Sequence, residues 1–344
     1  MGASTCSSSD ERRYDPAVTT PLVDGFGRVH RDLRISVTDR CNFRCTYCMP
    51  EEGMTWLPRT ELLSFEEITR VATVMVERFG VDSIRITGGE PTVRAHLPTL
   101  VGMLARLPVD LALTTNGATL RAVAADLAAA GLRRINVSCD SLRHDRFERI
   151  TKRDLLDKVL DGIDAALEAG LAPVKVNAVL MRGVNDDEIL DFARFGRERG
   201  VVVRFIEYMP LDAQGAWDNR SVVSFEEIHR TIDAVFPLEE VPNGSAPAER
   251  FRYRDGGGEI GIVASVTRSF CDRCDRVRLT AEGAFRNCLF AVDEFDLRGP
   301  LRSGADDDAL ADLVARAVGA KWAGHAINQV HFIRPNRSMS QIGG

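Results

Sequence analysis

The sequence lacks any long apolar segment. None of its apolar runs reaches the roughly 18 residues that a membrane-spanning helix requires. The first thirty residues contain no apolar core of the kind found in signal peptides, because the stretch STCSSSDERR is polar. We therefore expect residues 1–20 to form a disordered tail, and the protein to be cytoplasmic and to contact no membrane.

An excess of positive charge is also absent. The formal net charge is -6, and no basic stripe marks a nucleic-acid-binding surface, so we expect no nucleic-acid partner. The chain has 344 residues, of which 44% are hydrophobic, which suffices for a large core without disulfide staples. This length predicts two or three units, or one large domain with an appendage.

Short β-branched segments alternate with amphipathic ones between residues 33 and 209. Strands are predicted at 33–38, 83–88, 110–116, 134–140, 173–180 and 201–209. Helices are predicted between them at 64–80, 121–131, 155–170 and 186–200. Ser64 and Glu67 match a capping box before the first helix, and Gly80 follows it as a C-cap. The alternation indicates an α/β fold with a parallel sheet, either open or an incomplete barrel.

Apolar and polar residues alternate within these strands, although parallel strands covered on both faces usually read as continuous apolar runs. The polar face carries four cations: Arg34, Arg85, Lys175 and Arg204. Because side chains alternate faces along a strand, all four would point into one interior cavity. Unpaired buried charge is unfavourable, so such a cavity favours an anionic ligand. The alternative is that some of these cations pair with Asp140 or Glu207, or extend to the rim.

The pattern changes after about residue 245. We expect a linker at 242–250, a glycine-turn hairpin at 251–266 and a helix within 306–322, followed by a polar tail. The predicted organisation is thus a tail (1–20), a core barrel (21–245) and a C-terminal segment (246–344).

Six of the eight cysteines form two triplets, which indicates metal binding or catalysis in a reducing compartment. The triplets are Cys41, Cys45 and Cys48, and Cys271, Cys274 and Cys288. Structural zinc sites and iron–sulfur clusters usually take four protein ligands, so each triplet leaves one position open for an exchangeable ligand. His30, Cys6 or Cys139 could also supply a fourth ligand, which leaves zinc as an alternative. Otherwise Cys6 is a spectator thiol and Cys139 a small buried hydrophobe.

The first triplet has the form C-x3-C-x2-C, with the aromatic Tyr47 before its last cysteine. This pattern after a first strand, together with GGEP (88–91) at the end of the second, resembles the radical S-adenosylmethionine (SAM) superfamily. The glycines would allow close approach of the backbone, and Glu90 offers an acceptor for an ammonium group. The triplet, GGEP and NVSCD (136–140) all lie at strand carboxyl ends, where parallel folds bind ligands.

Further segments resemble one family within that superfamily, GTP 3',8-cyclase, which catalyses the first step of molybdenum cofactor biosynthesis. They include LRISVTDRCNFRCTYCMP, IRITGGEPTVR, RRINVSCDSL, SFCDRCDRVRLTAEGAFRNCLF and the terminal IGG. The resemblance runs from about Pro21 to Gly344. It implies an incomplete (βα)6 barrel closed by a C-terminal α+β segment that carries a second cluster. It also implies conversion of GTP to (8S)-3',8-cyclo-7,8-dihydroguanosine 5'-triphosphate through a 5'-deoxyadenosyl radical.

The same resemblance assigns roles to individual residues. The two cysteine triplets would each hold a [4Fe-4S] cluster. The predicted SAM contacts are Tyr47, Gly89, Glu90, Ser138 and Met209. The predicted GTP contacts are Arg34, Arg85, Thr114, Lys175, Arg276 and Arg278, with Arg204 a weaker candidate. Many family members have a lysine where this chain has Ser83, so one phosphate contact is missing or replaced. Gly343 and Gly344 would enter the active site, although terminal glycines are ordinarily frayed.

The implied partners are GTP, an electron donor that the sequence does not identify, and a downstream cyclic pyranopterin synthase. The chain would be a monomer or a homodimer. The main alternative is a peptide-modifying radical SAM enzyme with an auxiliary cluster, but the sequence shows no peptide-recognition region and no further cysteine cluster. A two-cluster electron carrier would leave GGEP and the cationic face unexplained. The acidic net charge disfavours a zinc-stabilised nucleic-acid binder.

Overall fold

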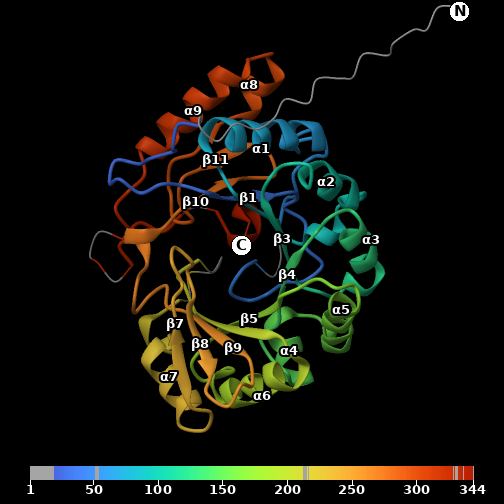
Figure 1. Cartoon of the computed structure of the whole chain (residues 1–344), viewed down its shortest axis with the longest axis vertical. Coiled ribbons are helices and arrows are strands. Elements are labelled where there is room, and N and C mark those ends of the chain that lie inside the picture. The colour runs from blue at the N-terminus through green and yellow to red at the C-terminus, as the bar shows by residue number, and fades with distance from the viewer. Residues whose placement is uncertain are drawn as a thin grey trace, which may run out of the picture.

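The computed structural model describes residues 19–50, 54–211, 215, 217–327, 329, 332–335 and 337–343. Most of the predicted disordered tail lies outside these residues, as do Cys6 and Gly344. Figure 1 shows strands arranged around the centre of the molecule, with most helices on the outside.

Six parallel strands form the middle of one sheet. They are β1 (Asp32–Ser36), β2 (Ser83–Thr87), β3 (Asp110–Thr115), β4 (Arg134–Ser138), β5 (Val174–Leu180) and β6 (Val202–Glu207). They lie side by side in chain order, which right-handed β-helix-β connections produce. All six predicted strands are therefore confirmed, with slightly shorter bounds.

Helices cover the outer face of these strands (Figure 1). They are α1 (Phe65–Phe79), α2 (Leu97–Leu104), α3 (Ala124–Ala129), α4 (His144–Thr151), α5 (Leu156–Glu168), α6 (Ile189–Arg199) and α7 (Phe225–Asp233). The capping box of α1 is confirmed, because the Ser64 hydroxyl accepts from the Glu67 amide at 3.1 Å and the Glu67 carboxylate accepts from the Ser64 amide at 2.7 Å. Helices α2, α4 and α7 were not predicted, since their 8, 8 and 9 residues give little more than two turns of periodicity. No helix of the described residues is both long and apolar enough to span a membrane.

Strands that follow β6 in the chain extend both edges of this sheet. At one edge β9 (Glu259–Val263) runs parallel to β6, followed by the antiparallel strands β8 (Glu249–Tyr253) and β7 (Leu238–Val241). At the other edge β10 (Arg276–Leu279) runs parallel to β1, followed by β11 (Ala284–Arg286) and β12 (Phe295–Asp296). The 12-stranded sheet of the described residues is not closed, because no pairing joins β7 to β12.

Two predictions for the C-terminal segment can be compared with the structure. The hairpin is confirmed as β8 and β9, but residues 249–250, which we expected in the linker, begin β8. The predicted helix is confirmed as α9 (Asp307–Gly319), which lies between α8 (Arg298–Arg302) and α10 (Met339–Ile342). The predicted boundary at residue 245 falls between the paired strands β7 and β8, and it remains a prediction.

The alternation along the strands separates an apolar outer face from a polar inner face, as predicted. Leu33, Ile35, Ile84 and Ile86 are each 0% exposed and belong to the main hydrophobic core. Cys139 is 1% exposed and lies in the same core, in agreement with its prediction as a small buried hydrophobe. The residues of opposite parity line the interior.

Candidate active site

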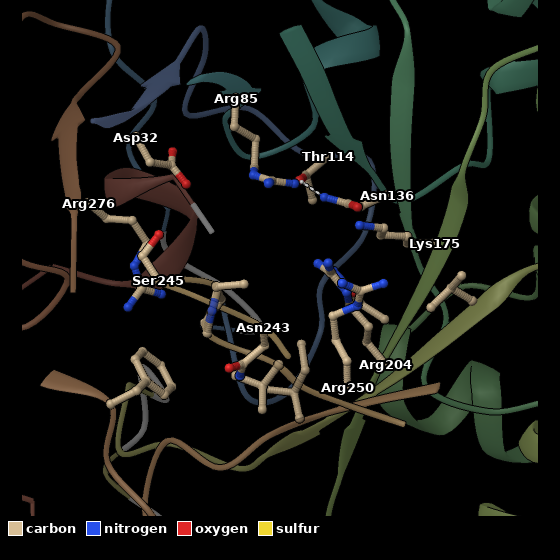
Figure 2. A pocket seen from close by; sticks show the side chains of 18 of the residues that line it. Asp32, Arg85, Thr114, Asn136, Lys175, Arg204, Asn243, Ser245, Arg250 and Arg276 are labelled. Carbon is tan, nitrogen blue, oxygen red and sulfur yellow. Dashed lines mark hydrogen bonds between the residues drawn. The ribbon is translucent and has the colours of Figure 1, made fainter. Parts of the chain in front are cut away.

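The inner face of the sheet lines a cavity of about 1080 Å³, which is large enough for a nucleotide. Thr114 and the second cysteine triplet contribute to its wall. Eight lysines and arginines line it: Arg34, Arg85, Arg134, Lys175, Arg204, Arg250, Arg276 and Arg278. Figure 2 shows Arg85, Lys175, Arg204 and Arg250 directed toward the same space. The predicted convergence of cations is therefore confirmed, and it is more extensive than predicted.

The strand register explains why these cations converge. Arg34 on β1 lies opposite Arg85 on β2 and opposite Arg278 on β10. Like charges directly opposite each other destabilise a sheet. Among the described residues, no hydrogen bond or ion pair satisfies the guanidinium groups of Arg34 and Arg85, and each has a buried Nε without a partner. A polyanionic ligand would compensate this charge.

Burial and mutual repulsion perturb the cations on the opposite wall. Burial lowers the pKa of Lys175 to about 7, and the charges of Arg204 and other arginines act in the same direction. Burial, followed by the charges of Arg85 and Arg34, lowers the pKa of Arg204 to about 9. These pKa values are typical of a functional site whose charge is compensated by substrate.

The two acidic residues considered as internal partners are occupied elsewhere. Asp140 accepts hydrogen bonds from the Tyr47 hydroxyl at 2.7 Å and from the Val179 amide at 2.8 Å. Glu207 is fully buried and accepts from the backbone amides of Phe225 at 2.9 Å and Val266 at 2.7 Å. The alternative that some of the four cations pair with Asp140 or Glu207 is therefore wrong.

The first cysteine triplet lies in the loop that follows β1. Helix α4 fixes this loop, because the Arg44 amide donates to the Thr151 carbonyl at 2.9 Å and the Thr46 amide to the Ile150 carbonyl at 3.0 Å. Burial raises the pKa of Cys41 to about 11 and holds the pKa of Cys45 well above its usual value. Metal ligation requires thiolates, so loading a cluster here would release protons.

The GGEP turn approaches this loop closely. The Gly89 amide donates to the Thr38 carbonyl at 2.7 Å. A Cβ on Gly89 would lie 2.4 Å from the Arg40 carbonyl oxygen, so only glycine fits without a shift of the backbone. The structure therefore shows close backbone approach at Gly89, which the sequence analysis expected glycine to allow, while contact of Gly89 with SAM remains a prediction.

Glu90 in this turn is fully buried. Its carboxylate accepts hydrogen bonds from the Thr92 amide at 2.9 Å, the Thr115 hydroxyl at 2.6 Å and the Asn116 amide at 2.6 Å. These bonds tie the carboxyl ends of β2 and β3 together. Its predicted role as an acceptor for the SAM ammonium group is not tested by these contacts.

The other predicted SAM residues lie at the same ends of the strands. The Tyr47 ring packs edge-on against Tyr208, with centroids 6.5 Å apart. Ser138 ends β4, and Met209 follows β6 and lines the cavity. Met209 also packs against a small hydrophobic cluster that contains Leu211. Their contacts with SAM remain predictions.

The second cysteine triplet lines the cavity beside β10 and has electropositive surroundings. Arg276 donates to the Cys274 sulfur at 3.2 Å, and the Lys321 ammonium lies 3.8 Å from the same sulfur. Burial raises the pKa of Cys274, but these two cations outweigh it and leave the pKa below its usual value. Burial also acts to raise the pKa of Cys271, but a hydrogen bond with His325 outweighs it, and this pKa is lowered to about 7. These surroundings favour thiolates at Cys271 and Cys274, whereas burial raises the pKa of Cys288.

Soft thiolate donors are the usual ligands of iron–sulfur clusters, so the residue types of both triplets fit such a group. Within the described ranges, no three Cys, His, Asp or Glu side chains are placed so that they could hold a metal ion. Cluster ligation therefore rests on family membership and not on this geometry.

The C-terminal end of the described chain enters the site. Gly343 follows α10, and its carbonyl accepts a hydrogen bond from the Arg278 guanidinium. Its φ is 84°, and a Cβ there would lie 2.5 Å from the Thr87 hydroxyl. The expectation of a frayed end is thus wrong for Gly343, because it is buried. Gly344 lies outside the described residues, and the catalytic role of both glycines remains a prediction.

Sequence reasoning missed two of the cavity cations. Arg134 has the same strand parity as Asn136, so extending the alternation by two residues would have found it. Arg250 was missed because its strand was taken for a linker. Lys321 and His325 were also missed, since only the tertiary fold brings them beside the second triplet and no local signal does so.

Known proteins are similar to this chain along most of its length. Residues 35–196 match the Radical SAM superfamily, and residues 201–327 match Molybdenum Cofactor Synthesis C. A protein of Rhodopirellula baltica named GTP 3',8-cyclase is 49% identical over 348 residues, which cover 98% of this chain and 97% of that relative. The chain belongs to the GTP 3',8-cyclase family. A family member from Streptomyces coelicolor is 48% identical and covers 94% of the chain and 96% of its own length. Another from Mycobacterium bovis, GTP 3',8-cyclase 2, is 49% identical, and the match covers 96% of this chain and 95% of that relative.

Solved structures share the fold of this GTP 3',8-cyclase family member, and its match to the Radical SAM superfamily identifies that fold. Streptococcus suis SuiB bound to S-adenosylmethionine has a TM-score of 0.59 at 14% identity and covers 83% of this chain and 68% of the SuiB chain. A second SuiB structure has a TM-score of 0.60 at 15% identity, and the match covers 90% of this chain and 76% of the SuiB chain. One SuiB structure contains a precursor peptide, but at 15% identity the likeness extends to the fold alone and does not favour the peptide alternative. Membership of the superfamily implies a [4Fe-4S] cluster and SAM.

Proposed function

We propose that this chain converts GTP to (8S)-3',8-cyclo-7,8-dihydroguanosine 5'-triphosphate, the first step of molybdenum cofactor biosynthesis. The observation that carries the proposal is the convergence of eight cations and a cysteine triplet on one cavity, in a chain 49% identical to a protein named GTP 3',8-cyclase. A nucleoside triphosphate supplies both the negative charge that this cavity favours and a base to contact the second triplet.

The first triplet would hold the SAM-binding cluster and the second triplet a second [4Fe-4S] cluster. When bound, the first cluster and SAM supply, with one electron, a 5'-deoxyadenosyl radical that takes the 3'-hydrogen of GTP, after which C3' bonds to C8 of guanine. Ring closure leaves one unpaired electron, so a second electron and a proton are also required. An electron donor is therefore a necessary partner, and a cyclic pyranopterin synthase would consume the product.

The chain's own residues bind and orient the two small molecules. Tyr47, Gly89, Glu90, Ser138 and Met209 form the proposed SAM site at the strand carboxyl ends. Arg34, Arg85, Thr114, Lys175, Arg276 and Arg278 form the proposed GTP site. Charge-assisted contacts from guanidinium groups would hold the triphosphate in a fixed position, which favours reaction at a single ribose carbon.

The test is formation of 5'-deoxyadenosine and cyclised nucleotide by the anaerobically reconstituted, reduced protein with SAM. GTP should support both products and ATP should support neither to a comparable extent. Cys45→Ala should abolish SAM cleavage, because it removes one of three thiolates. Cys139→Ala is the matched control, since this cysteine is buried in the hydrophobic core and lies outside both triplets. Equal turnover with ATP and GTP would contradict the substrate assignment, and full cleavage by Cys45→Ala would contradict the cluster assignment.

A further inference from the structure

The two ends of the cavity differ in how far their positive charge is compensated. Near the second triplet, Arg276 donates a hydrogen bond to the Cys274 sulfur at 3.2 Å, and Asp32 on β1 lies opposite Arg276 in the strand register. At the other end, the strongest charges acting on Lys175 come from arginines, and Arg250 is among them. The polyanionic part of a substrate is therefore favoured at the end of the cavity formed by β5, β6 and β8.

Arg250 reaches this end through the register of three neighbouring strands. Gly261 on β9 lies opposite Arg204 on β6 and opposite Arg250 on β8. A Cβ on Gly261 would lie 3.3 Å from Cγ of Arg204, so the glycine makes room between the two arginines. Figure 2 shows the guanidinium groups of Arg204 and Arg250 beside each other and directed toward Lys175.

One carboxylate holds the Arg250 side chain in this position. Its guanidinium forms an ion pair of 2.7 Å with Glu259, and its side chain is 40% exposed. The other terminal nitrogen donates to the Pro242 carbonyl at 3.4 Å. A guanidinium has five N–H donors, so these two contacts leave donors for an anionic ligand. Because the Glu259 contact already restricts the Arg250 side chain, less conformational entropy is lost when its remaining donors bind a ligand.

Arg252 supplies a natural comparison. It lies two residues further along β8, so its side chain has the same parity as that of Arg250. It also faces Glu259, at 3.9 Å, and lies 3.6 Å from Glu239, but it is 53% exposed and does not line the cavity. The two arginines thus share a strand, a face and a carboxylate, and differ in access to the interior.

From these observations we infer that Arg250 is a further substrate-binding residue, which contacts the triphosphate of GTP together with Lys175 and Arg204. The inference rests on the proposed function for the identity of the nucleotide. It assigns to the C-terminal segment a part in binding the phosphates, separate from its cysteine triplet.

The test measures the binding of GTP and of inorganic tripolyphosphate to the cluster-loaded protein by anaerobic titration calorimetry. Tripolyphosphate is the probe for the phosphate contacts without guanosine. Arg250→Ala should weaken binding of both about tenfold, the lower end of the range for a charge-assisted hydrogen bond, because the side chain is partly exposed. Arg252→Ala should change either affinity by less than about twofold. SAM affinity and the unfolding temperature should be the same in both variants and the wild type.

Three results would overturn the inference: unchanged affinity in Arg250→Ala, equal losses in the two variants, or a loss of SAM affinity as large as the loss of GTP affinity. Arg250→Lys, which keeps the charge, should recover part of the tripolyphosphate affinity, and a variant no better than alanine would show that charge is not the cause. A wild-type protein that binds tripolyphosphate but not GTP would contradict the proposed function. The inference about Arg250 would then be tested by the tripolyphosphate affinities of the variants alone. Binding of neither would overturn both.

Discussion

Lys175 should take up a proton when GTP binds. Burial and the surrounding arginines lower its pKa to about 7 in the ligand-free protein. The phosphates of GTP would favour its charged form and raise this pKa. At pH 8 about one in ten free molecules carries a charged Lys175, so each binding event should take up about 0.9 proton.

The same shift sets the pH dependence of affinity. The charged fraction of Lys175 falls from about one half at pH 7 to about one tenth at pH 8, so GTP affinity should fall roughly fivefold over this interval. Above pH 8 the decrease should approach about tenfold for each pH unit. Phosphate groups with a second pKa of about 6 are already ionised in this range, so they contribute little to the change.

The assay is titration calorimetry at pH 8 in two buffers with different ionisation enthalpies, from which the number of protons taken up is obtained. Lys175→Arg is the control, because arginine stays charged across this range and should bind GTP with little proton uptake and little pH dependence. Absence of uptake by the wild type, or equal uptake by Lys175→Arg, would refute the argument that this lysine is discharged by its surroundings.

Three further variants test separate parts of the site. Gly343→Ala should lower product formation with iron content unchanged, because its Cβ would lie 2.5 Å from the Thr87 hydroxyl. Gly304→Ala is the control, since Gly304 has a similar φ of 86° but open space around it, and it should keep full activity. Equal activity in the two variants would show that the tail has no role in product formation. Gly89→Ala should impair SAM binding, since its Cβ would lie 2.4 Å from the Arg40 carbonyl. Gly319→Ala, where an added Cβ would have no neighbour within 4 Å, should bind SAM normally. Titration of both variants with SAM measures the difference, and equal affinities would contradict the prediction. Burial raises the pKa of Asp140 from 3.8 to about 6, so the neutral form is favoured in the fold, and its contribution to the free energy of unfolding should increase by about 1 kcal/mol as pH falls from 7 to 5. Asp140→Asn should lack this increase in denaturant titrations at the two pH values. A pH dependence identical to that of the wild type would show that the pKa of Asp140 is not raised in the fold.

The sequence predicts the central part of the fold because its periodic signals are local. The six strands, the capping box of α1 and the hairpin of β8 and β9 follow from alternation, cap residues and glycine turns. The short helices α2, α4 and α7 were missed, since two turns carry too little periodicity. The addition of β10 beside β1 was also missed, because it joins residues more than two hundred positions apart, and no local pattern encodes such a pairing.

The sequence likewise predicts those features of the candidate site that follow from local patterns, and misses those that depend on tertiary packing. Strand parity alone predicts that Arg34, Arg85, Lys175 and Arg204 line one cavity, and they do. Parity cannot show that Asp140 is taken by Tyr47, or that Glu207 is taken by backbone amides, since both partners depend on tertiary packing. The role of Arg250 depends on a glycine in the strand between two arginines, which becomes visible only when β6, β9 and β8 are aligned.

The most direct test of the central claim follows a single hydrogen atom. GTP deuterated at the 3'-carbon is incubated with SAM and the reduced, cluster-loaded protein, and 5'-deoxyadenosine is analysed by mass spectrometry. If this chain cyclises GTP as proposed, one deuterium per turnover appears in 5'-deoxyadenosine, and the cyclised nucleotide lacks it. If 5'-deoxyadenosine forms without deuterium, while the nucleotide retains its label, hydrogen is not taken from the 3'-carbon and the assigned reaction is contradicted.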